Sequence, residues 1–238
     1  MNPSVNSPAD SSGSAVDPPD GRADRREKAV PGAGVSGRAG RLFGSGGAGR
    51  RTTTAVAEFG NVDRNIYRAV AATPTPTLDE TFRKVSLVAD HSMLWIGIAG
   101  VTALLGGHRG RRAAFDGVVS IAVSSAVVNA TLKPALPRER PDRELHQVIV
   151  ARHVPLPKST SFPSGHSASA FAFATGVSGE LPELAVPLRL AAAAVAWSRV
   201  HTGVHYPGDI IVGSLIGGAG GETVGWVRRR HERRLGRL

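Results

Sequence analysis

Two histidines and an aspartate lie at turns where they could act on a bound anion. In the tetrad Pro163-Ser164-Gly165-His166, Pro163 favours an extended chain before it, and Ser164 can cap a helix that begins at Gly165. The free N–H groups of that first helical turn favour an anion. His166 stands where it could give a proton to one of the anion's oxygens. Alone, however, the tetrad also fits a plain helix start with a surface histidine.

The second pair of chemical groups is His205 and Asp209, which are separated by the turn Tyr206-Pro207-Gly208. A carboxylate that accepts a hydrogen bond from one imidazole nitrogen fixes the tautomer and leaves the other nitrogen free to attack. Asp209 is also well placed to cap the helix that follows the turn. A purely structural hydrogen bond is the alternative interpretation of such a pair.

Three cations lie near the ends of apolar segments. Lys133 ends one apolar run, Arg199 ends another, and Arg140 is fixed between two extended segments by Pro141. Each is commonplace alone, but an antiparallel helical topology places all three on the same face as the two histidines. Cations and helix N–H groups that hold oxygens, with one histidine to attack and one to protonate, suit phosphoryl transfer. The sequence shows no acidic cluster that could hold Mg²⁺, so neither a metal nor another cofactor is expected.

The elements that would position these residues are predicted to be helices. Five apolar runs, rich in Ala, Gly and Ser and separated by polar turns, indicate an all-α bundle of about five core helices: residues 93–107, 113–132, 167–177, 184–197 and 210–226. Most runs are shorter than the ~20 residues of a spanning helix, although small residues suit close helix contacts in lipid.

Arginines mark one end of this bundle. They follow the first run at Arg109, Arg111 and Arg112, and the last run from Arg228 to Arg237, which the topology puts on the same side. By the positive-inside rule we expect an integral protein of the plasma membrane, with a cytoplasmic C-terminus and an extracytoplasmic site.

Composition divides the chain into four predicted segments. Residues 1–54, rich in Gly, Pro, Ser and Arg, are expected to form a disordered basic tail. Residues 55–91 predict two amphipathic helices that lie on the membrane or on the bundle. Residues 92–228 form the bundle, and residues 229–238 a basic tail. The net charge of +10 fits nucleic acid, an anionic membrane or phosphorylated substrates, but no interleaved aromatic and basic strip is present, so nucleic acid is not expected.

The spacing of the chemical residues resembles a known family. Lys133 followed by Arg140-Pro141, then Pro163-Ser164-Gly165-His166, then Ser198-Arg199 with His205 and Asp209, is similar to the three signature motifs of the type 2 phosphatidic acid phosphatase (PAP2) superfamily. Members often carry six spanning helices, whereas here the segment 55–91 takes the place of the first.

The resemblance implies a metal-independent membrane phosphatase that acts on a lipid phosphate or a polyprenyl diphosphate. His205 would form a phosphohistidine, Asp209 would orient it, and His166 would protonate the leaving group and then activate water. Lys133, Arg140, Arg199, Ser164 and the Gly165 N–H would hold the phosphate.

Two alternatives stay open. Vanadium haloperoxidases and soluble acid phosphatases resemble the same constellation, because vanadate mimics the phosphoryl transition state. Soluble acid phosphatases are normally exported, and the opening residues 1–5 predict no cleavable signal peptide. A non-catalytic membrane scaffold would be expected to lack a motif residue, and none is missing. The sequence holds no code for the lipid or for the oligomeric state.

Overall fold

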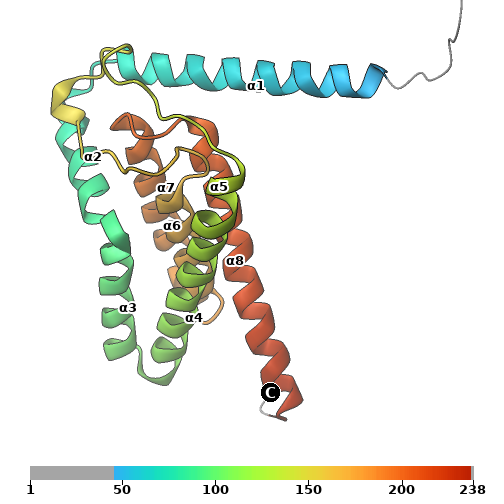
Figure 1. The fold of residues 1–238 in the computed structure, drawn as a ribbon. Coiled ribbons are helices and arrows are strands. Elements are labelled where there is room, and N and C mark those ends of the chain that lie inside the picture. Colours follow the sequence, from blue (N-terminus) through green and yellow to red (C-terminus); the bar gives the residue numbers. More distant parts are fainter. Residues whose placement is uncertain (1–45, 237–238) are drawn as a thin grey trace, which may run out of the picture. The chain divides into compact units, whose positions relative to one another are not determined.

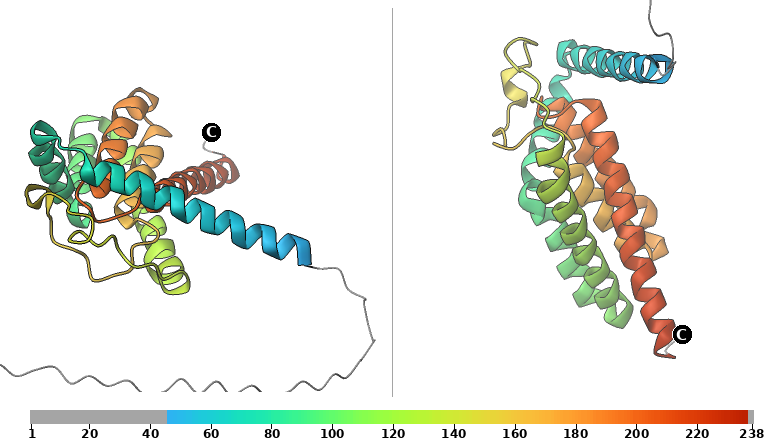
Figure 2. Two further views of the ribbon diagram at one scale, coloured as in Figure 1. Left: turned by 90° about the horizontal axis from the view of Figure 1, so that it is seen from above. Right: turned by 45° about the vertical axis from the view of Figure 1, so that its right-hand side comes forward.

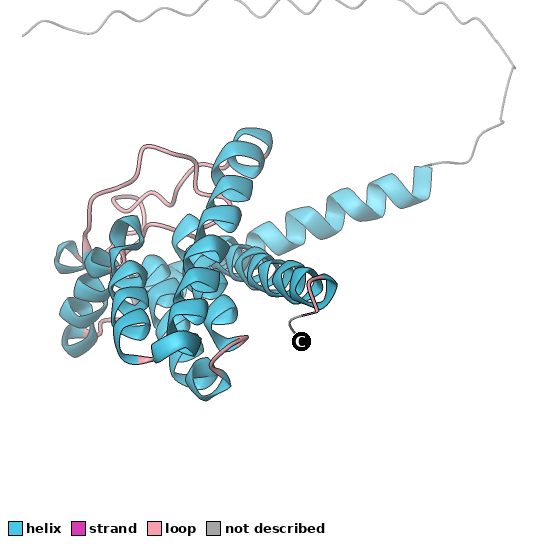
Figure 3. Ribbon diagram, turned by 90° about the horizontal axis from the view of Figure 1, so that it is seen from below, coloured by secondary structure: helices cyan, strands magenta, loops and turns pink. Residues whose placement is uncertain are grey.

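The computed structural model describes residues 46–236, and within that range the chain consists of helices and loops without strands (Figures 1 and 3). The all-α prediction is thus confirmed. The helices are α1 (Gly46–Ala72), α2 (Pro76–Val88), α3 (Met93–Leu105), α4 (Gly107–Ala126), α5 (Lys133–Ala135), α6 (Gly165–Ser178), α7 (Ala185–His201) and α8 (Pro207–Arg234). The five predicted core helices are α3, α4, α6, α7 and α8.

Two predicted boundaries need correction. The first helix begins at Gly46 rather than at 55, so part of the segment assigned to a disordered tail is helical, while residues 1–45 lie outside the described range. At the other end, α8 continues to Arg234, so the basic segment assigned to a tail from 229 is largely the last turns of a helix. Arginine is a good helix former and is favourable near a helix C-terminus, which explains the extension.

Helix α6 is the centre of the bundle and is packed against α4, α7 and α8 (Figure 2). Its buried residues include four alanines, and Phe173 and Val177 are completely buried. At 14 residues it is shorter than the ~20 residues that cross a bilayer. Because its neighbours surround it, its polar start at Ser164 to His166 can lie inside the protein rather than in lipid.

A row of glycines on α8 brings it close to α6. Side chains at Gly213 or Gly217 would collide with the backbone carbonyls of Ser164 and Ala168. Such close approach through small residues is typical of helix pairs in membranes. It places the first turns of the two helices together, and the Ser164 N–H donates to the Asp209 carbonyl at 3.0 Å. Two motifs more than forty residues apart therefore become neighbours.

Helices α2 and α3 are joined by a bend of 58° at the short turn Asp90–Ser92. His91 and Ser92 have φ values of 50° and 61°, a backbone conformation that is unusual for residues other than glycine. Helix α2 packs against α7, and its Asp79 and Ser86 are buried. The structure thus packs α2 on the bundle, which is one of the two positions predicted for the segment 55–91.

Within the part of the chain that the structure describes, two helices are long and apolar enough to cross a membrane: the continuous segment Gly107–Ala135, which contains α4 and α5, and Pro207–Arg234. The bent pair of α2 and α3 meets the same criterion when taken together. Helices of this length and hydropathy are those of an integral membrane protein.

The end of the bundle away from the predicted chemical residues is tied by ion pairs. Arg228 pairs with Asp116 at 2.7 Å, with Glu232 at 2.9 Å, and with Glu180. Arg112 also pairs with Glu180 and Glu232. The α3–α4 turn, the α6–α7 turn and the end of α8 therefore meet, as the predicted topology requires.

Arginines also hold the long connection between α5 and α6, which is loop apart from the short 3-10 helix Val150–Arg152 (Figure 3). Arg152, which is fully buried, donates to Asp79 at 2.8 Å and to the carbonyls of Val70 and Thr73 at the end of α1. Arg143 donates to the Val154 carbonyl at 2.8 Å. Guanidinium groups thus replace the regular backbone hydrogen bonds that the loop lacks.

Candidate active site

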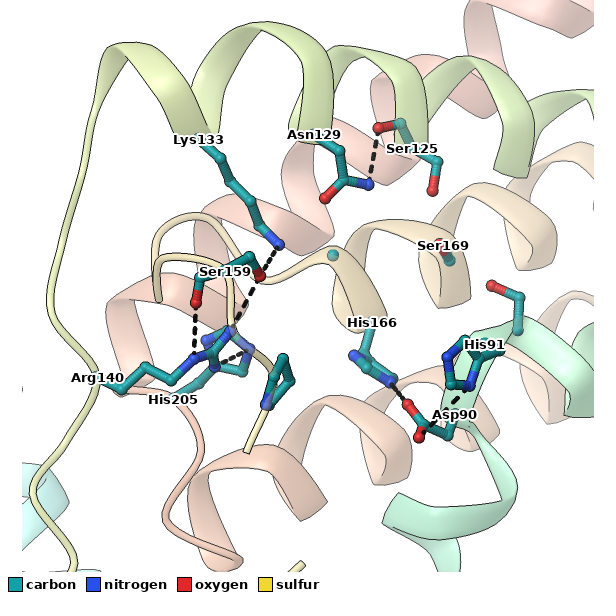
Figure 4. A pocket seen from close by; sticks show the side chains of 13 residues that line it. Asp90, His91, Ser125, Asn129, Lys133, Arg140, Ser159, His166, Ser169 and His205 are labelled. Carbon is teal, nitrogen blue, oxygen red and sulfur yellow. Dashed lines mark hydrogen bonds and ion pairs between the residues drawn. The ribbon is translucent and has the colours of Figure 1, made fainter. Parts of the chain in front are cut away.

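A cavity of about 400 Å³ lies where the end of the α4–α5 segment, the start of α6, the α7–α8 turn and the Asp90–Ser92 bend meet. Figure 4 shows its side chains converging from these elements. Five of the residues predicted from the sequence line it: Lys133, Arg140, Gly165, His166 and His205. The further lining residues are Asp90, His91, Ser92, Ser125, Asn129, Pro157, Ser159 and Ser169.

His205 and Asp209 form the pair expected from their spacing. The Nδ1 atom of His205 is 3.3 Å from Oδ2 of Asp209. Both side chains are buried, and the same carboxylate oxygen accepts from the Tyr206 N–H at 2.9 Å and from the Ser161 hydroxyl. Asp209 thereby also caps α8, as predicted. Because the carboxylate is held on Nδ1, the other ring nitrogen, Nε2, is directed to the cavity, 3.4 Å from Arg140 Nη1.

The environment keeps the His205 ring neutral. Burial lowers the pKa of His205 to about 4, and the positive charges of Arg140 and Arg199 act in the same direction against the opposing effect of Asp209. Above about pH 4 the ring is therefore unprotonated at Nε2. A neutral imidazole with one nitrogen fixed by a carboxylate is equipped to act as a nucleophile.

His166 also has a carboxylate partner, which lies on a different element. Its Nε2 atom is 3.0 Å from Oδ1 of Asp90, in the bend between α2 and α3. In Figure 4 the ring lies between Asp90 on one side and His205 with Arg140 on the other. The two histidines thus face one cavity, each with an aspartate on one ring nitrogen.

The two cations of the cavity are Lys133 and Arg140. Lys133 Nζ donates to the Ser159 hydroxyl at 3.0 Å and lies 3.9 Å from where a Cβ on Gly165 would stand. Arg140 donates to the carbonyls of Ser159 and Val204 at 3.0 Å. Burial lowers the pKa of Arg140, yet an arginine remains cationic in proteins. The cavity therefore presents positive charge beside both imidazoles.

Three predicted site residues do not line the cavity. The Ser164 hydroxyl is buried and accepts from the Ser167 N–H at 3.3 Å, so it caps α6 as predicted. Asp209 stands behind His205. Arg199 is turned to the carbonyl and hydroxyl of Ser86, and its Nε has no partner among the described residues. The guanidinium still lies close enough to lower the pKa of His205.

Arg138 and Asp90 lie at the site but were not singled out from the sequence, whereas Ser161 belongs to the loop run Ser159-Thr160-Ser161, for which a phosphate contact is the alternative to a turn-forming role. Arg138 joins Asp209 at 2.8 Å to Asp63 of α1 at 2.6 Å, and Ser161 binds the same Asp209 carboxylate. In the sequence, only the positive charge of Arg138, two residues before Arg140, indicated that this residue could belong to the site. The partner of Asp90 is 76 positions away, and nothing local marks that contact.

The small-residue helical bundle and its cavity with two histidines and two cations point to the class of membrane-embedded phosphatases. The model of the PAP2 superfamily matches residues 113–232, and the chain belongs to that family. It is 31% identical to decaprenylphosphoryl-5-phosphoribose phosphatase of Mycobacterium tuberculosis over 67% of this chain and 87% of the relative. It is 34% identical to lipid A 1-phosphatase of Rhizobium etli over 40% of this chain and 42% of the relative.

Two solved structures of phosphatases are similar to this chain in fold. Aquifex aeolicus LpxE is 25% identical, with a TM-score of 0.56 over 67% of this chain and 92% of that one. The PAP2 type phosphatidylglycerolphosphate phosphatase of Bacillus subtilis is 21% identical, with a TM-score of 0.58 over 73% and 87%, and supports the fold. The chain is thus a phosphatase of the lipid-phosphatase family, and the haloperoxidase and scaffold alternatives are not favoured.

Proposed function

We propose that the protein removes phosphate from a membrane lipid phosphate or a polyprenyl diphosphate in two steps, through a phosphohistidine on His205. The observation that carries this proposal is the single cavity that holds His166, His205, Lys133 and Arg140 at the end of a membrane bundle. The similarity to a phosphatase named for a decaprenylphosphoryl substrate makes polyprenyl lipids the first substrates to test.

In the first step Nε2 of His205 attacks phosphorus, a P–N bond forms and the P–O bond to the lipid breaks. His166 gives its proton to the leaving oxygen, so the lipid departs as an alcohol, or as a monophosphate from a diphosphate. Lys133, Arg140 and the N–H groups at the start of α6 stabilise the charge on the phosphoryl oxygens. Arg199 adds positive charge from its buried position.

In the second step a water molecule attacks phosphorus and the P–N bond breaks. His166, now neutral, takes the proton of that water, and inorganic phosphate leaves. Both histidines return to their starting states, since the proton given up in the first step is recovered in the second. Asp209 keeps the His205 tautomer correct throughout by accepting from Nδ1–H.

The whole scheme uses no metal. Among the described residues there is no group of three or more His, Asp and Glu side chains placed to hold one, and metal independence stays a prediction. The purified protein in detergent should release phosphate from a polyprenyl lipid phosphate, phosphatidic acid or phosphatidylglycerol phosphate at the same rate with and without EDTA. No release from any of these lipids would refute the proposed function, and loss of release with EDTA would refute the metal-free chemistry.

The lipid chain has a route from the cavity into the bilayer. An apolar groove of about 660 Å³ lies between α3 and α7, lined by Val88, Met93, Gly97, Leu188 and neighbouring apolar side chains. Val88 and Met93 flank the Asp90–Ser92 bend, and that bend lines the catalytic cavity. The two sets of lining residues therefore adjoin at this bend, and we place the hydrocarbon chain of the bound lipid in the groove.

Gly97 offers a clean test of this placement. A Cβ there meets nothing within 4 Å, and the same is true of Gly100 on the same helix, which does not line the groove. Gly97→Phe should lower kcat/KM for a long-chain substrate about tenfold, because each buried CH₂ is worth ~0.8 kcal/mol and the ring excludes two or more of them. Kinetics with a short-chain phosphate should be unchanged, as should Gly100→Phe with both. Equal effects of the two variants would contradict the placement.

Orientation in the membrane is part of the proposal. The arginine-rich end, with Arg109, Arg111, Arg112 and the last turns of α8, is placed on the cytoplasmic side of the plasma membrane by the positive-inside rule. The catalytic cavity, at the other end of the bundle, then opens on the extracytoplasmic side.

A further inference from the structure

We propose that Asp90 is a positioning residue for His166, so that the site contains two His–Asp pairs, one for the nucleophile and one for the proton donor. The inference rests on the proposed function and assigns a role to a residue outside the three motifs. It concerns the step in which the leaving oxygen receives its proton.

The geometry of the contact is that of a hydrogen bond. Asp90 Oδ1 lies 3.0 Å from Nε2 of His166. The His166 side chain is largely buried, with 18% of its surface exposed, while that of Asp90 is 45% exposed. Asp90 is the one carboxylate among the residues that line the cavity. Its other oxygen, Oδ2, lies 3.5 Å from Nδ1 of the exposed His91.

The backbone at Asp90 supports a role beyond chain reversal. The two residues that follow it, His91 and Ser92, both take positive φ values. For residues other than glycine this conformation costs free energy, and such residues are found preferentially at functional sites. Here the bend moves the start of α3 so that Asp90 meets the first turn of α6, as Figure 4 shows.

The contact with Asp90 determines which nitrogen of His166 exchanges a proton with the substrate. A carboxylate accepts only, so Nε2 carries a hydrogen that it donates to Asp90, and Nδ1 is left for the leaving oxygen. The other pair uses the opposite nitrogens: His205 donates Nδ1–H to Asp209 and attacks phosphorus with Nε2. Around His166 the facing charges are cations, namely Lys133 and Arg140 across the cavity and Arg199 from α7. Burial and the positive charge of Arg199 lower the pKa of His166 to about 3, and Asp90 opposes that shift. The imidazolium therefore forms when an anionic phosphate is bound beside the ring, and Asp90 is the carboxylate that stabilises it there.

The proton transfer then balances without another group. When the P–O bond breaks, Nδ1–H of the imidazolium moves to the leaving oxygen and the ring becomes neutral, with Nε2–H still donated to Asp90. When water attacks the phosphohistidine, its proton goes to Nδ1. The Asp90 carboxylate stays ionised in both steps and only orients and stabilises the ring, as a carboxylate does beside a catalytic histidine.

The leaving group provides the test. The alcohol of a lipid phosphate needs a proton to leave, whereas p-nitrophenolate leaves without one. In Asp90→Asn, kcat/KM for the lipid phosphate should fall by at least about tenfold and by up to ~10⁴-fold, the loss that follows when the carboxylate that orients a catalytic histidine is replaced by an amide. With p-nitrophenyl phosphate, kcat/KM should change by less than about threefold. In this scheme kcat/KM reports transfer of the phosphoryl group to His205, and p-nitrophenolate leaves in that step without a proton. Asp90→Glu should recover part of the lipid activity.

The matched control is Glu80→Gln, which removes an exposed carboxylate of α2 that pairs with Lys84 and does not line the cavity. It should leave both substrates unaffected. An equal loss with both substrates in Asp90→Asn would show a merely structural role, and no loss with the lipid would show no role; either overturns the inference. A wild-type protein inactive on both substrates would instead refute the proposed function.

Discussion

His205→Ala is expected to abolish phosphatase activity, with kcat/KM for lipid phosphates lowered by at least about a thousandfold, since removal of a nucleophile costs as much as removal of a whole catalytic unit. The loss should be as large with p-nitrophenyl phosphate, because a better leaving group cannot replace the attacking nitrogen. Initial rates with both substrates measure this directly.

The structure provides a control for the His205 variant. His201 is also buried but binds Asp79 at 3.0 Å, outside the catalytic cavity. Removal of either imidazole disturbs packing near α7, so comparison of His205→Ala with His201→Ala separates chemistry from stability. A His205→Ala protein that is folded and retains even a tenth of the wild-type rate would contradict the assignment.

His166→Ala is expected to have the second largest effect on activity, and this effect should depend on the leaving group of the substrate. With a lipid phosphate, kcat/KM should fall by about 10²–10⁴-fold, the usual contribution of a general acid. With p-nitrophenyl phosphate the first step needs no proton, but the second step has lost its base. We therefore expect a burst of p-nitrophenol of up to one equivalent per enzyme, followed by slow turnover.

A stopped-flow measurement of p-nitrophenol distinguishes the two histidines. The burst should appear in His166→Ala and be absent in His205→Ala, because only the former can still be phosphorylated. Similar behaviour of the two variants, with no burst in either, would mean that the roles of general acid and nucleophile are not divided in the way the geometry suggests.

The parts of the fold that depend on local pattern could be predicted from the sequence. The apolar runs predicted the core helices because each run carries at most one charged residue. The His205–Asp209 contact could be predicted because it spans a single tight turn, where Pro207 and Gly208 leave little freedom. Ser164 at the start of α6 has the cap that its sequence signature indicates.

Contacts between distant segments could not be predicted. Asp90 reaches His166 only because α2 and α3 meet at a bend with two left-handed residues, which no periodicity marks. Arg199 ends a helix, as expected, but the buried Ser86 of α2 takes its hydrogen bonds. The start of α1 at Gly46 could not be predicted, because a stretch of small residues and arginines carries no helix-start signal.

The central claim is that His205 carries the phosphoryl group. A labelling experiment with the His166→Ala variant tests this claim directly. The variant is mixed with a ³²P-labelled phosphate ester, denatured during the burst and digested, and the labelled peptide is identified. The account predicts one acid-labile, alkali-stable label per chain, in the peptide that contains His205. A label on another residue, or none in an enzyme that shows the burst, would contradict it.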